Sequence, residues 1–483
     1  MSDTYLIIDI GTSSLRVALL DEQRSIITSQ TIKRSAPPVF DADSEWALIY
    51  QMIRTICSEH RSLKAIAVSS LLGWVGIDYS GAAVTPCYSY MHQESAQYQA
   101  FCLQHHPHGL YDICKRQLAP EQLAFKLQRI KKEDPCLYER LQCFVSLKDY
   151  INLKLTGIAA LDHTTASYTM LYDVCAGSWS DSCLRTFDLD AAHLPQLLHP
   201  WEPLGPLRPD LCADLALTQS CPVAVGSVDG SCGILGAGGT LSGTMVSVMG
   251  TTDTCFLVQD SLPDDKTCNL VVNPHVIPGL FLAGGPMGMY GGTLEWMLNN
   301  LTQGASTLPQ MNQLASEIPA GSCGVLAFPS LAGERTPFWA ADMRGTFLGL
   351  THESHSGHVF RAILEANCYA TRRIVDLLED GNSHVKQVLA TGGGSQSDLW
   401  LQLKSDILKV PVMRSNAKEA TLEGTGILAM MASGTPLEKI SLPPAVQTFP
   451  VRPDSALAYD SLYSSYLRVH DILLNIYPVS NNT

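Results

Sequence analysis

Apolar and polar positions follow the same pattern twice, once near the start of the chain and once about halfway along it. Residues Tyr5–Leu20 read YLIIDIGTSSLRVALL, and residues Met245–Val258 read MVSVMGTTDTCFLV. Each segment consists of an apolar run, a Gly-Thr turn rich in hydroxyl groups, and a second apolar run. This pattern predicts a β-hairpin at each place. Two such hairpins, half a chain apart, predict two related domains.

The tips of the two predicted hairpins offer backbone N–H groups and hydroxyls. Such tips can cradle phosphate oxygens, so we expect the two domains to hold one phosphate chain from both sides. The two copies differ in one respect, because Asp9 precedes the first tip whereas Val248 occupies the corresponding position in the second. The first copy therefore brings a carboxylate to its tip.

The rest of the chain mixes strand-like and helix-like segments, which indicates an α/β protein. A helix near Trp46–His60 and a buried strand at Ala65–Ser69 follow the first hairpin. Apolar residues at three- and four-residue spacing predict helical stretches at Pro120–Lys132, Pro135–Thr156, His358–Asp380 and Ala456–Tyr477. We place the domain boundary in a Gly-rich stretch, which gives domains at residues 1–242 and 243–483.

Length, charge and cysteine usage narrow the class of protein. The 483 residues are too many for one ordinary core. The net charge of −14, with no run of Lys or Arg, disfavours nucleic acid or an anionic membrane as the main partner. No apolar stretch reaches the roughly 18–20 residues of a membrane span, and no charged-then-apolar leader is seen. The fifteen scattered cysteines contain no CxxC pair, which predicts reduced thiols in a cytoplasmic protein.

Three short segments carry residues suited to catalysis or ligand binding. Asp9 ends a buried strand, where Mg²⁺ bound through water would offset the burial of its charge; stabilisation of the turn is the alternative. Asp229 lies in the segment GSVDG and could accept a proton from a substrate hydroxyl, although a helix N-cap is the alternative. Thr391–Ser395 joins a strand to a helix through three glycines, as either a nucleotide-binding turn or a tight turn would.

Several common nucleotide-binding patterns are absent from the sequence. There is no Gly-Lys dipeptide and hence no P-loop of the GxxxxGK[ST] kind, and no HRD or DFG set of a protein kinase. The segment GAGG at 236–239 does not have the GxGxxG spacing of a dinucleotide-binding fold. These absences leave a P-loop protein, a protein kinase and a dinucleotide-binding fold without support.

Taken in order, these and other segments resemble the FGGY carbohydrate kinases, a family of the actin-like ATPase superfamily. DIGTSSLRVALLD is similar to the family's first phosphate loop, GSVDG to the segment of the catalytic Asp, and VMGTTDT to the second phosphate loop. The stretch SLKDYINLKLTG (146–157) is similar to a further family segment, and residues 345–365 fit the family's C-terminal signature. The resemblance covers nearly the whole chain.

The resemblance implies an α/β fold with two actin-like (ribonuclease-H-like) domains and an active-site cleft between them. It implies that Asp229 is the general base, which takes the proton of a sugar hydroxyl as that oxygen attacks the γ-phosphoryl group of ATP. Asp9 and Asp229 would hold Mg²⁺, mainly through water. The residues that would bind ATP and its phosphates are Gly11, Thr12, Ser13, Gly250, Thr251, Thr252, Gly392, Gly393, Gly394 and Ser395.

The part of the sequence that faces the sugar departs from the family's pattern. Pentulose kinases commonly have Gln-Met-His-Gly after the third strand, whereas residues 69–74 read SSLLGW. Further on, His92 and Glu94 replace a usual Asp and Arg, and Arg129 stands where a Trp is usual. We place Trp74, His92 and Asp229 at the sugar. Because this half is altered, we expect a substrate other than plain xylulose or glycerol, either a ketose (xylulose-like) or a sugar acid (gluconate-like).

Two other functions fit the same fold and are kept as alternatives. One is an actin-like ATPase that works as a mechanical switch or chaperone, against which the signature at 345–365 and Asp229 argue. The other is a family member that binds sugar without phosphorylating it, against which Asp9, Asp229 and the two phosphate loops argue. The expected partners are ATP and a small sugar or polyol, with no nucleic acid and no membrane. A homodimer is left open.

Overall fold

The computed structural model describes residues 3–93, 95–105 and 110–477, and the chain divides into two compact units. The first unit comprises Met1–Gly236, Asn273–Gly279 and Ala417–Leu442, and the second comprises Ala237–Val272, Leu280–Asn416 and Pro443–Thr483. The proposed domain boundary between residues 242 and 243 stays a prediction. In the described residues, no helix is both long and apolar enough to cross a membrane.

The first unit is built on a sheet that contains the first predicted hairpin. Its strands are β1 (Thr4–Ile10), β2 (Ser14–Asp21), β3 (Ile26–Lys33), β5 (Ala65–Ser70), β13 (Pro203–Pro206), β14 (Pro222–Ala224) and β15 (Ser227–Val228). The strand order is β13-β14-β5-β1-β2-β3, and β15 also pairs with β5. The strands β1, β2 and β3 are antiparallel, whereas β5 runs parallel to β1 and β14 runs parallel to β5.

The second unit repeats this arrangement. Its sheet contains β16 (Thr244–Met249), β17 (Asp253–Gln259), β18 (Val271–Pro274), β19 (Phe281–Pro286), β22 (Gln387–Thr391), β23 (Val412–Ser415) and β24 (Ala445–Phe449). The strands β16, β17 and β19 are antiparallel, β22 runs parallel to β16, and β23 runs parallel to β22. Both predicted hairpins and the predicted internal repeat are therefore confirmed.

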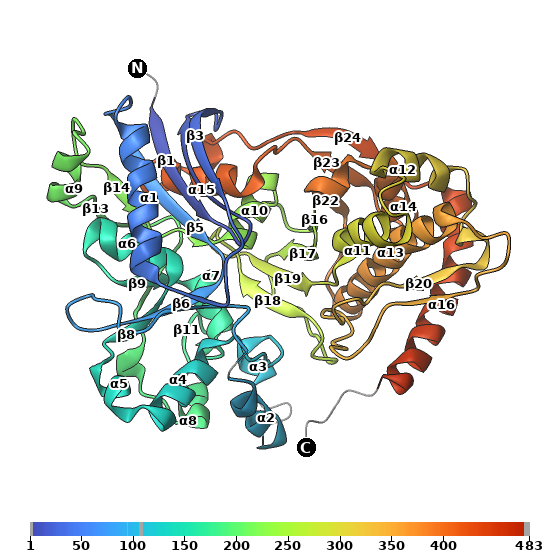
Figure 1. Cartoon of the computed structure of the whole chain (residues 1–483), viewed down its shortest axis with the longest axis horizontal. Coiled ribbons are helices and arrows are strands. Elements are labelled where there is room, and N and C mark those ends of the chain that lie inside the picture. The colour runs from blue at the N-terminus through green and yellow to red at the C-terminus, as the bar shows by residue number, and fades with distance from the viewer. Residues whose placement is uncertain (1–2, 94, 106–109, 478–483) are drawn as a thin grey trace. The chain divides into compact units, whose positions relative to one another are not determined.

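Helices cover the sheet of the first unit, and the alternation of side chains along β1 shows which face each helix covers. Leu6, Ile8 and Ile10 belong to a buried cluster with residues of α1 (Ala42–Cys57) and α6 (Leu147–Thr156). Ile7 points the other way and reaches Gly426 of α15 (Ala420–Ala432). Since Asp9 follows Ile7 by two residues, its side chain lies on the α15 face. Figure 1 labels these elements.

Two glycines allow α10 (Asp229–Ala237) and α15 to pack closely. A Cβ atom on Gly236 would lie 1.8 Å from the carbonyl oxygen of Ala420, and one on Gly424 would lie 1.8 Å from that of Cys232. Neither position has room for a larger residue. The contact ties α15, which lies far along the chain, to the helix that begins with Asp229.

Among the described residues, five α-helices belong to the second unit. They are α11 (Tyr290–Trp296), α12 (Leu308–Ser316), α13 (Ser356–Asp380), α14 (Asp398–Leu408) and α16 (Pro453–Ile476). In Figure 1, α13 and α14 lie beside each other. The predicted helices at His358–Asp380 and Ala456–Tyr477 are confirmed to within a few residues.

One predicted element is wrong. The stretch Pro135–Thr156 is not a single helical segment, because α5 (Pro135–Arg140) and α6 are separated by the strand β8 (Cys143–Ser146). This strand is completely buried and pairs with β6 (Gly73–Ile77). The apolar spacing of the segment fits a helix locally, but pairing with a distant strand decides its conformation.

The remaining elements are a smaller sheet in the first unit, further helices and several short strands. A small sheet has the order β4-β7-β6-β8, with β4 at Val39–Phe40 and β7 at Cys87–Ser89. Shorter helices are α2 (Ala96–His105), α3 (Tyr111–Cys114), α4 (Leu123–Glu133), α7 (His163–Ala166), α8 (Asp181–Phe187) and α9 (Pro209–Asp214). Short strands are β9 (Ala160–Asp162), β10 (Tyr172–Asp173), β11 (Ser178–Trp179), β12 (Gln196–Leu198), β20 (Leu326–Phe328) and β21 (Thr346–Leu348).

Candidate active site

The sheet of the first unit brings Asp9 and Asp229 to the same edge. Asp9 on β1 is in register with Ser69 on β5, and Ser69 is in register with Ser227 on β15. These three strands are parallel, so their carboxyl ends meet at one edge, which is where α/β proteins bind ligands. Asp229 follows β15 directly and begins α10. The sequence therefore predicted two carboxylates that the fold places near one another.

Asp9 has a positive partner that the sequence analysis did not identify. Arg16 lies opposite Asp9 in the β1–β2 hairpin, and its Nη2 is 2.6 Å from Asp9 Oδ2. Ser69 donates a hydrogen bond of 3.0 Å to Asp9 Oδ1. Arg16 also pairs with Glu419, which immediately precedes α15. Burial raises the pKa of Asp9, and Arg16 opposes this effect. The β-hairpin register could have revealed Arg16, since directly opposed residues share a face.

Asp229 has the environment of a group that gains and loses a proton near neutral pH. Burial and then the nearby charge of Asp9 raise the pKa of Asp229 to about 7. Its Oδ1 accepts a hydrogen bond of 2.7 Å from the N–H of Gly230. An N-cap side chain instead accepts from the second or third residue of the helix. The contact of Asp229 therefore differs from that of an ordinary N-cap.

The first predicted phosphate loop, Gly11 to Ser13, is fixed by hydrogen bonds to its backbone carbonyl groups, while its tip stays accessible. Arg34 donates to the carbonyl oxygen of Gly11 through Nε and Nη2, at 3.1 and 2.9 Å. The backbone N–H of Ala36 donates to the carbonyl of Thr12. Ser13 is exposed and Thr12 is partly exposed. The loop is thus braced through its carbonyl groups, while Thr12 and Ser13 keep partial and full exposure, and Thr12 Oγ1 lies 3.3 Å from the hydroxyl of Tyr90.

The second predicted phosphate loop, Gly250 to Thr252, rests on the start of α11. A Cβ atom on Gly291 would lie 2.2 Å from the carbonyl oxygen of Gly250, so only glycine allows this approach. The N–H of Gly292 donates a hydrogen bond of 3.0 Å to the carbonyl of Thr251. Thr251 and Thr252 are exposed. Both loops therefore keep accessible Thr or Ser residues while neighbouring segments fix their backbones.

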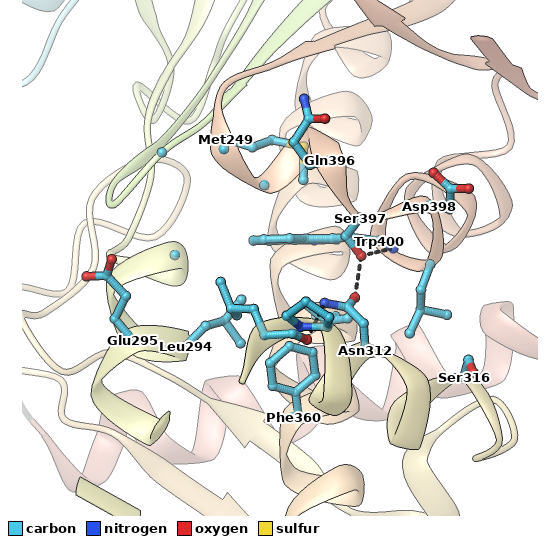
Figure 2. A pocket seen from close by; sticks show the side chains of 18 of the residues that line it. Met249, Leu294, Glu295, Asn312, Ser316, Phe360, Gln396, Ser397, Asp398 and Trp400 are labelled. Carbon is cyan, nitrogen blue, oxygen red and sulfur yellow. Dashed lines mark hydrogen bonds between the residues drawn. The ribbon is translucent and has the colours of Figure 1, made fainter. Parts of the chain in front are cut away.

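A cavity of about 680 Å³ in the second unit connects this loop with the glycine turn at 391–395. Of the predicted residues, Gly250, Thr251, Gly393 and Gly394 line it. Thr252, Gly392 and Ser395 are not among its lining residues; Gly392, at φ +85°, lies against the backbone of Met249. Figure 2 shows the other side chains around the cavity: apolar Leu294, Phe360 and Trp400, and polar Glu295, Asn312, Ser316, Gln396, Ser397 and Asp398.

A buried polar network lies behind this cavity, and the sequence analysis missed it. The carboxylate of Asp253, in the second hairpin, accepts a hydrogen bond of 2.8 Å from Asn367 on α13. The side-chain oxygen of Asn367 accepts one of 3.0 Å from Trp400 Nε1. Burial raises the pKa of Asp253 to about 6, which the positive charge of Lys404 opposes. The second copy of the hairpin thus has a carboxylate of its own, located after the tip instead of before it.

The residues predicted to face the sugar are mostly buried. Trp74 on β6 is fully buried, and His92 is 3% exposed. His92 Nδ1 lies 3.2 Å from Lys126 Nζ, and the ring of His92 contacts that of Tyr88. Glu94 lies outside the described residues. The roles of Trp74 and His92 stay predictions.

A second cationic group lies on the side of the first unit near Asp229. The guanidinium of Arg116 is buried, lies 4.2 Å from the ring centre of Tyr168, and bonds to Asn273. Asn273 also donates to the hydroxyl of Tyr168 at 3.3 Å. Burial raises the pKa of Tyr168, and the charge of Asp229 adds to this effect. In the described parts of the chain, no carboxylate forms an ion pair with Arg116. Buried charges are usually paired, so an unpaired one suggests contact with a ligand.

Comparison with known proteins gives one consistent result. Residues 4–236 match the N-terminal domain of the FGGY family of carbohydrate kinases, and residues 245–433 match its C-terminal domain. A xylulose kinase of Bacillus subtilis (strain 168) is 27% identical over 325 residues, which are 67% of this chain and 65% of that relative. The gluconokinase of the same strain is 25% identical over 508 residues, covering 99% of this chain and 97% of the relative.

A solved structure agrees with these relatives. The crystal structure of a xylulose kinase from Brucella ovis superposes with a TM-score of 0.90 at 25% identity, covering 98% of this chain and 100% of that one. The predicted α/β fold class with two actin-like domains is therefore confirmed. The resemblance seen in the sequence motifs is confirmed as well.

Proposed function

This chain belongs to the FGGY family of carbohydrate kinases, and we propose that it transfers the γ-phosphoryl group of ATP to a hydroxyl of a small ketose or sugar acid, with Asp229 as general base. The observation that carries the role of Asp229 is its position beside Asp9, with a pKa raised to about 7. A base with such a pKa is ionised in part at neutral pH and still basic enough to accept the proton. The relatives named xylulose kinase and gluconokinase support a ketose or a sugar acid as substrate.

The two carboxylates fit a divalent cation. In the described residues, no group of three or more His, Cys, Asp and Glu side chains could hold a metal, so an all-protein site is not available there. Mg²⁺ commonly binds through one or two carboxylates, waters and phosphate oxygens, and Asp9 with Asp229 could supply the two carboxylates. When bound, Mg²⁺ would neutralise charge on the phosphate chain. Arg16, paired with Asp9, favours the ionised form of that carboxylate and orients it.

The cavity of the second unit has apolar and polar groups that suit a nucleoside with phosphates. It combines an apolar floor, which includes Phe360 and Leu294, with polar groups around it and the loop at Gly250 and Thr251 along its lining. Apolar walls with a few placed polar groups are typical of small-molecule sites. We assign this cavity to adenosine. Phosphoryl transfer needs mainly positioning and charge neutralisation, which backbone loops, hydroxyls and a cation can supply.

Arg116, Tyr168 and Asn273 are the residues of the first unit that we assign to the sugar in addition to Trp74 and His92. Arg116 supplies hydrogen-bond donors that suit hydroxyl or carboxylate oxygens. Asn273 holds both Arg116 and Tyr168, so the group is already arranged before a ligand binds. A preorganised polar site of this kind suits a substrate rich in hydroxyl or carboxylate oxygens.

The proposal is tested by turnover with purified protein. We expect ADP release to require an added sugar, and a screen over ketoses, polyols and sugar acids to identify the acceptor. Substitution Asp229→Asn should abolish phosphoryl transfer while ATP still binds with nearly unchanged affinity. Persisting turnover in this variant would show that Asp229 is not the base. Slow ATP hydrolysis that no sugar accelerates would instead indicate a switch-like ATPase.

A further inference from the structure

A buried cluster of charged side chains lies next to the strand that leads to Asp229. Lys148 Nζ is 2.5 Å from Asp149 Oδ1 and 2.9 Å from Asp162 Oδ1, and all three side chains are buried. Burial raises the pKa of Asp149 to about 6, and the charge of Asp162 adds to this effect. Buried ion pairs are often no more stabilising than apolar residues of similar size. Stability alone therefore does not account for this cluster.

The cluster binds the backbone and side chains just before Asp229. The carbonyl oxygen of Val225 accepts hydrogen bonds from Lys148 Nζ at 3.2 Å and from Asn152 Nδ2 at 2.8 Å. Two residues later, Ser227 Oγ donates a hydrogen bond of 2.9 Å to Asp162 Oδ2. The residues four and two positions before Asp229 are thus fixed by the same charged group.

The other side of this segment lies directly against β5. Gly226 has φ +73°, and a Cβ atom on it would lie 2.0 Å from the carbonyl oxygen of Val68. Ser227 and Val228 pair with Ser69 and Ser70 of the same strand. The segment is therefore held between β5 and the charged cluster, and Asp229 follows it without any intervening loop.

We propose that Asp162 is a positioning residue that fixes the carboxylate of Asp229 for proton transfer. Its own carboxylate is held by the ion pair with Lys148 and accepts the hydrogen bond from Ser227. This inference rests on the proposed role of Asp229 as base. A displacement of about 1 Å in a reacting group can cost about 100-fold in rate. A hydrogen bond to the second residue before Asp229 restricts such displacement, because only Val228 separates the two residues.

The structure offers a matched pair of variants for the test. Ser146 Oγ donates a hydrogen bond of 2.5 Å to Asp149 Oδ2, and Ser146 is as buried as Ser227. Ser227→Ala and Ser146→Ala therefore each remove one hydroxyl from one carboxylate of the same cluster. Only Ser227 belongs to the segment before Asp229. The two variants should lose similar thermal stability, so stability serves as the internal control.

We expect Ser227→Ala to lower kcat about 10-fold with an unchanged KM for ATP, and Ser146→Ala to keep the kcat of the unchanged protein. Asn152→Ala, which removes the bond to Val225, should lower kcat in the same way and serves if Ser227→Ala does not fold. Equal kcat values in the Ser227 and Ser146 variants would overturn the positioning role. Asp229→Asn is measured beside them: if it is inactive while Ser227→Ala is fully active, only the positioning role fails. If Asp229→Asn is active, the proposed base itself is wrong.

Discussion

Asn367 donates a hydrogen bond of 2.8 Å to the buried carboxylate of Asp253. The oxygen of the same side chain accepts a hydrogen bond from Trp400, whose ring lines the cavity of the second unit. One amide on α13 therefore links the hairpin that carries the second phosphate loop to the helix that borders the cavity. We expect this link to affect nucleotide binding more than sugar binding.

Replacement of Asn367 by Ala should weaken both the fold and ATP binding. The change leaves the buried Asp253 carboxylate and the Trp400 N–H without this partner, which costs about 1–3 kcal/mol for each unsatisfied group. We expect a lower melting temperature and a KM for ATP raised about 10-fold, with the KM for the sugar unchanged. Asn475→Ala serves as control, because Asn475 is exposed and its side chain, among the described residues, bonds to Asp471 of its own helix. Equal effects on both KM values would contradict the link.

The rate should depend on pH through Asp229. Only the ionised carboxylate can accept a proton, and its pKa is raised to about 7. The value of kcat/KM for the sugar should therefore rise as the pH increases towards 7 and level off above pH 7. Initial rates between pH 5.5 and 8.5 at saturating ATP would show this limb. A profile that is flat over this range would mean that the group acting as base has an ordinary carboxylate pKa.

The same raised pKa predicts how stability responds to Asp229→Asn. The folded protein holds the Asp229 proton up to about pH 7, whereas an exposed Asp loses it near 3.8. Ionisation of Asp229 thus favours the unfolded state, and stability from this group is lost as the pH rises from about 4 to 7. Asn cannot ionise, so the melting temperature of the variant should exceed that of the unchanged protein at pH 8 by more than at pH 4.5. Thermal unfolding without Mg²⁺ at both pH values measures this difference in melting temperature. A difference that does not vary with pH would contradict the raised pKa of Asp229.

Two glycines of the same helix should respond in opposite ways to alanine. Gly236→Ala would place a methyl carbon 1.8 Å from the carbonyl oxygen of Ala420 in α15. We therefore expect the free energy of unfolding to fall by several kcal/mol, on the scale of overpacked cores. A Cβ atom on Gly233 would lie 3.4 Å from Thr421 Oγ1, which is ordinary contact. Gly233→Ala should be neutral or stabilise by up to about 1 kcal/mol, because Ala favours a helix. Urea unfolding of both variants decides; equal stability would mean that α10 and α15 are less tightly packed.

Arg116→Met should separate sugar binding from ATP binding. Met keeps much of the apolar stem of Arg116 but removes the guanidinium, and with it the donors that we assign to the sugar. The KM for the sugar should rise at least 10-fold while that for ATP stays the same. Arg208→Met is a suitable control, since Arg208 is partly exposed and pairs with Asp210. An unchanged sugar KM would remove Arg116 from the sugar site.

The sequence predicted the repeated hairpins and their phosphate loops because local patterns determine both. Two apolar runs joined by a Gly-Thr turn define a hairpin without reference to the rest of the chain. Asp9 and Asp229 were identified for a similar reason, since each lies at the carboxyl end of a short buried strand and near glycines. Their proximity, in contrast, depends on the parallel pairing of β1, β5 and β15.

Residues whose partners lie far along the chain were not predictable in this way. Asp253 and Asn367 are 114 positions apart, and no spacing rule connects them. The strand at Cys143–Ser146 was interpreted as helix because its partner β6 lies about 70 positions earlier. Local apolar spacing cannot report on such pairings.

The contact between α10 and α15 has a consequence for how the protein is made. The helix α15, at Ala420–Ala432, belongs to the first unit, whose sheet begins at Thr4. While a ribosome is still synthesising residues before 420, the face of β1 and β5 that α15 covers has no cover from that helix. The first unit can therefore reach its final packing only when nearly nine-tenths of the chain has been translated, by which time most of the second unit has also been synthesised.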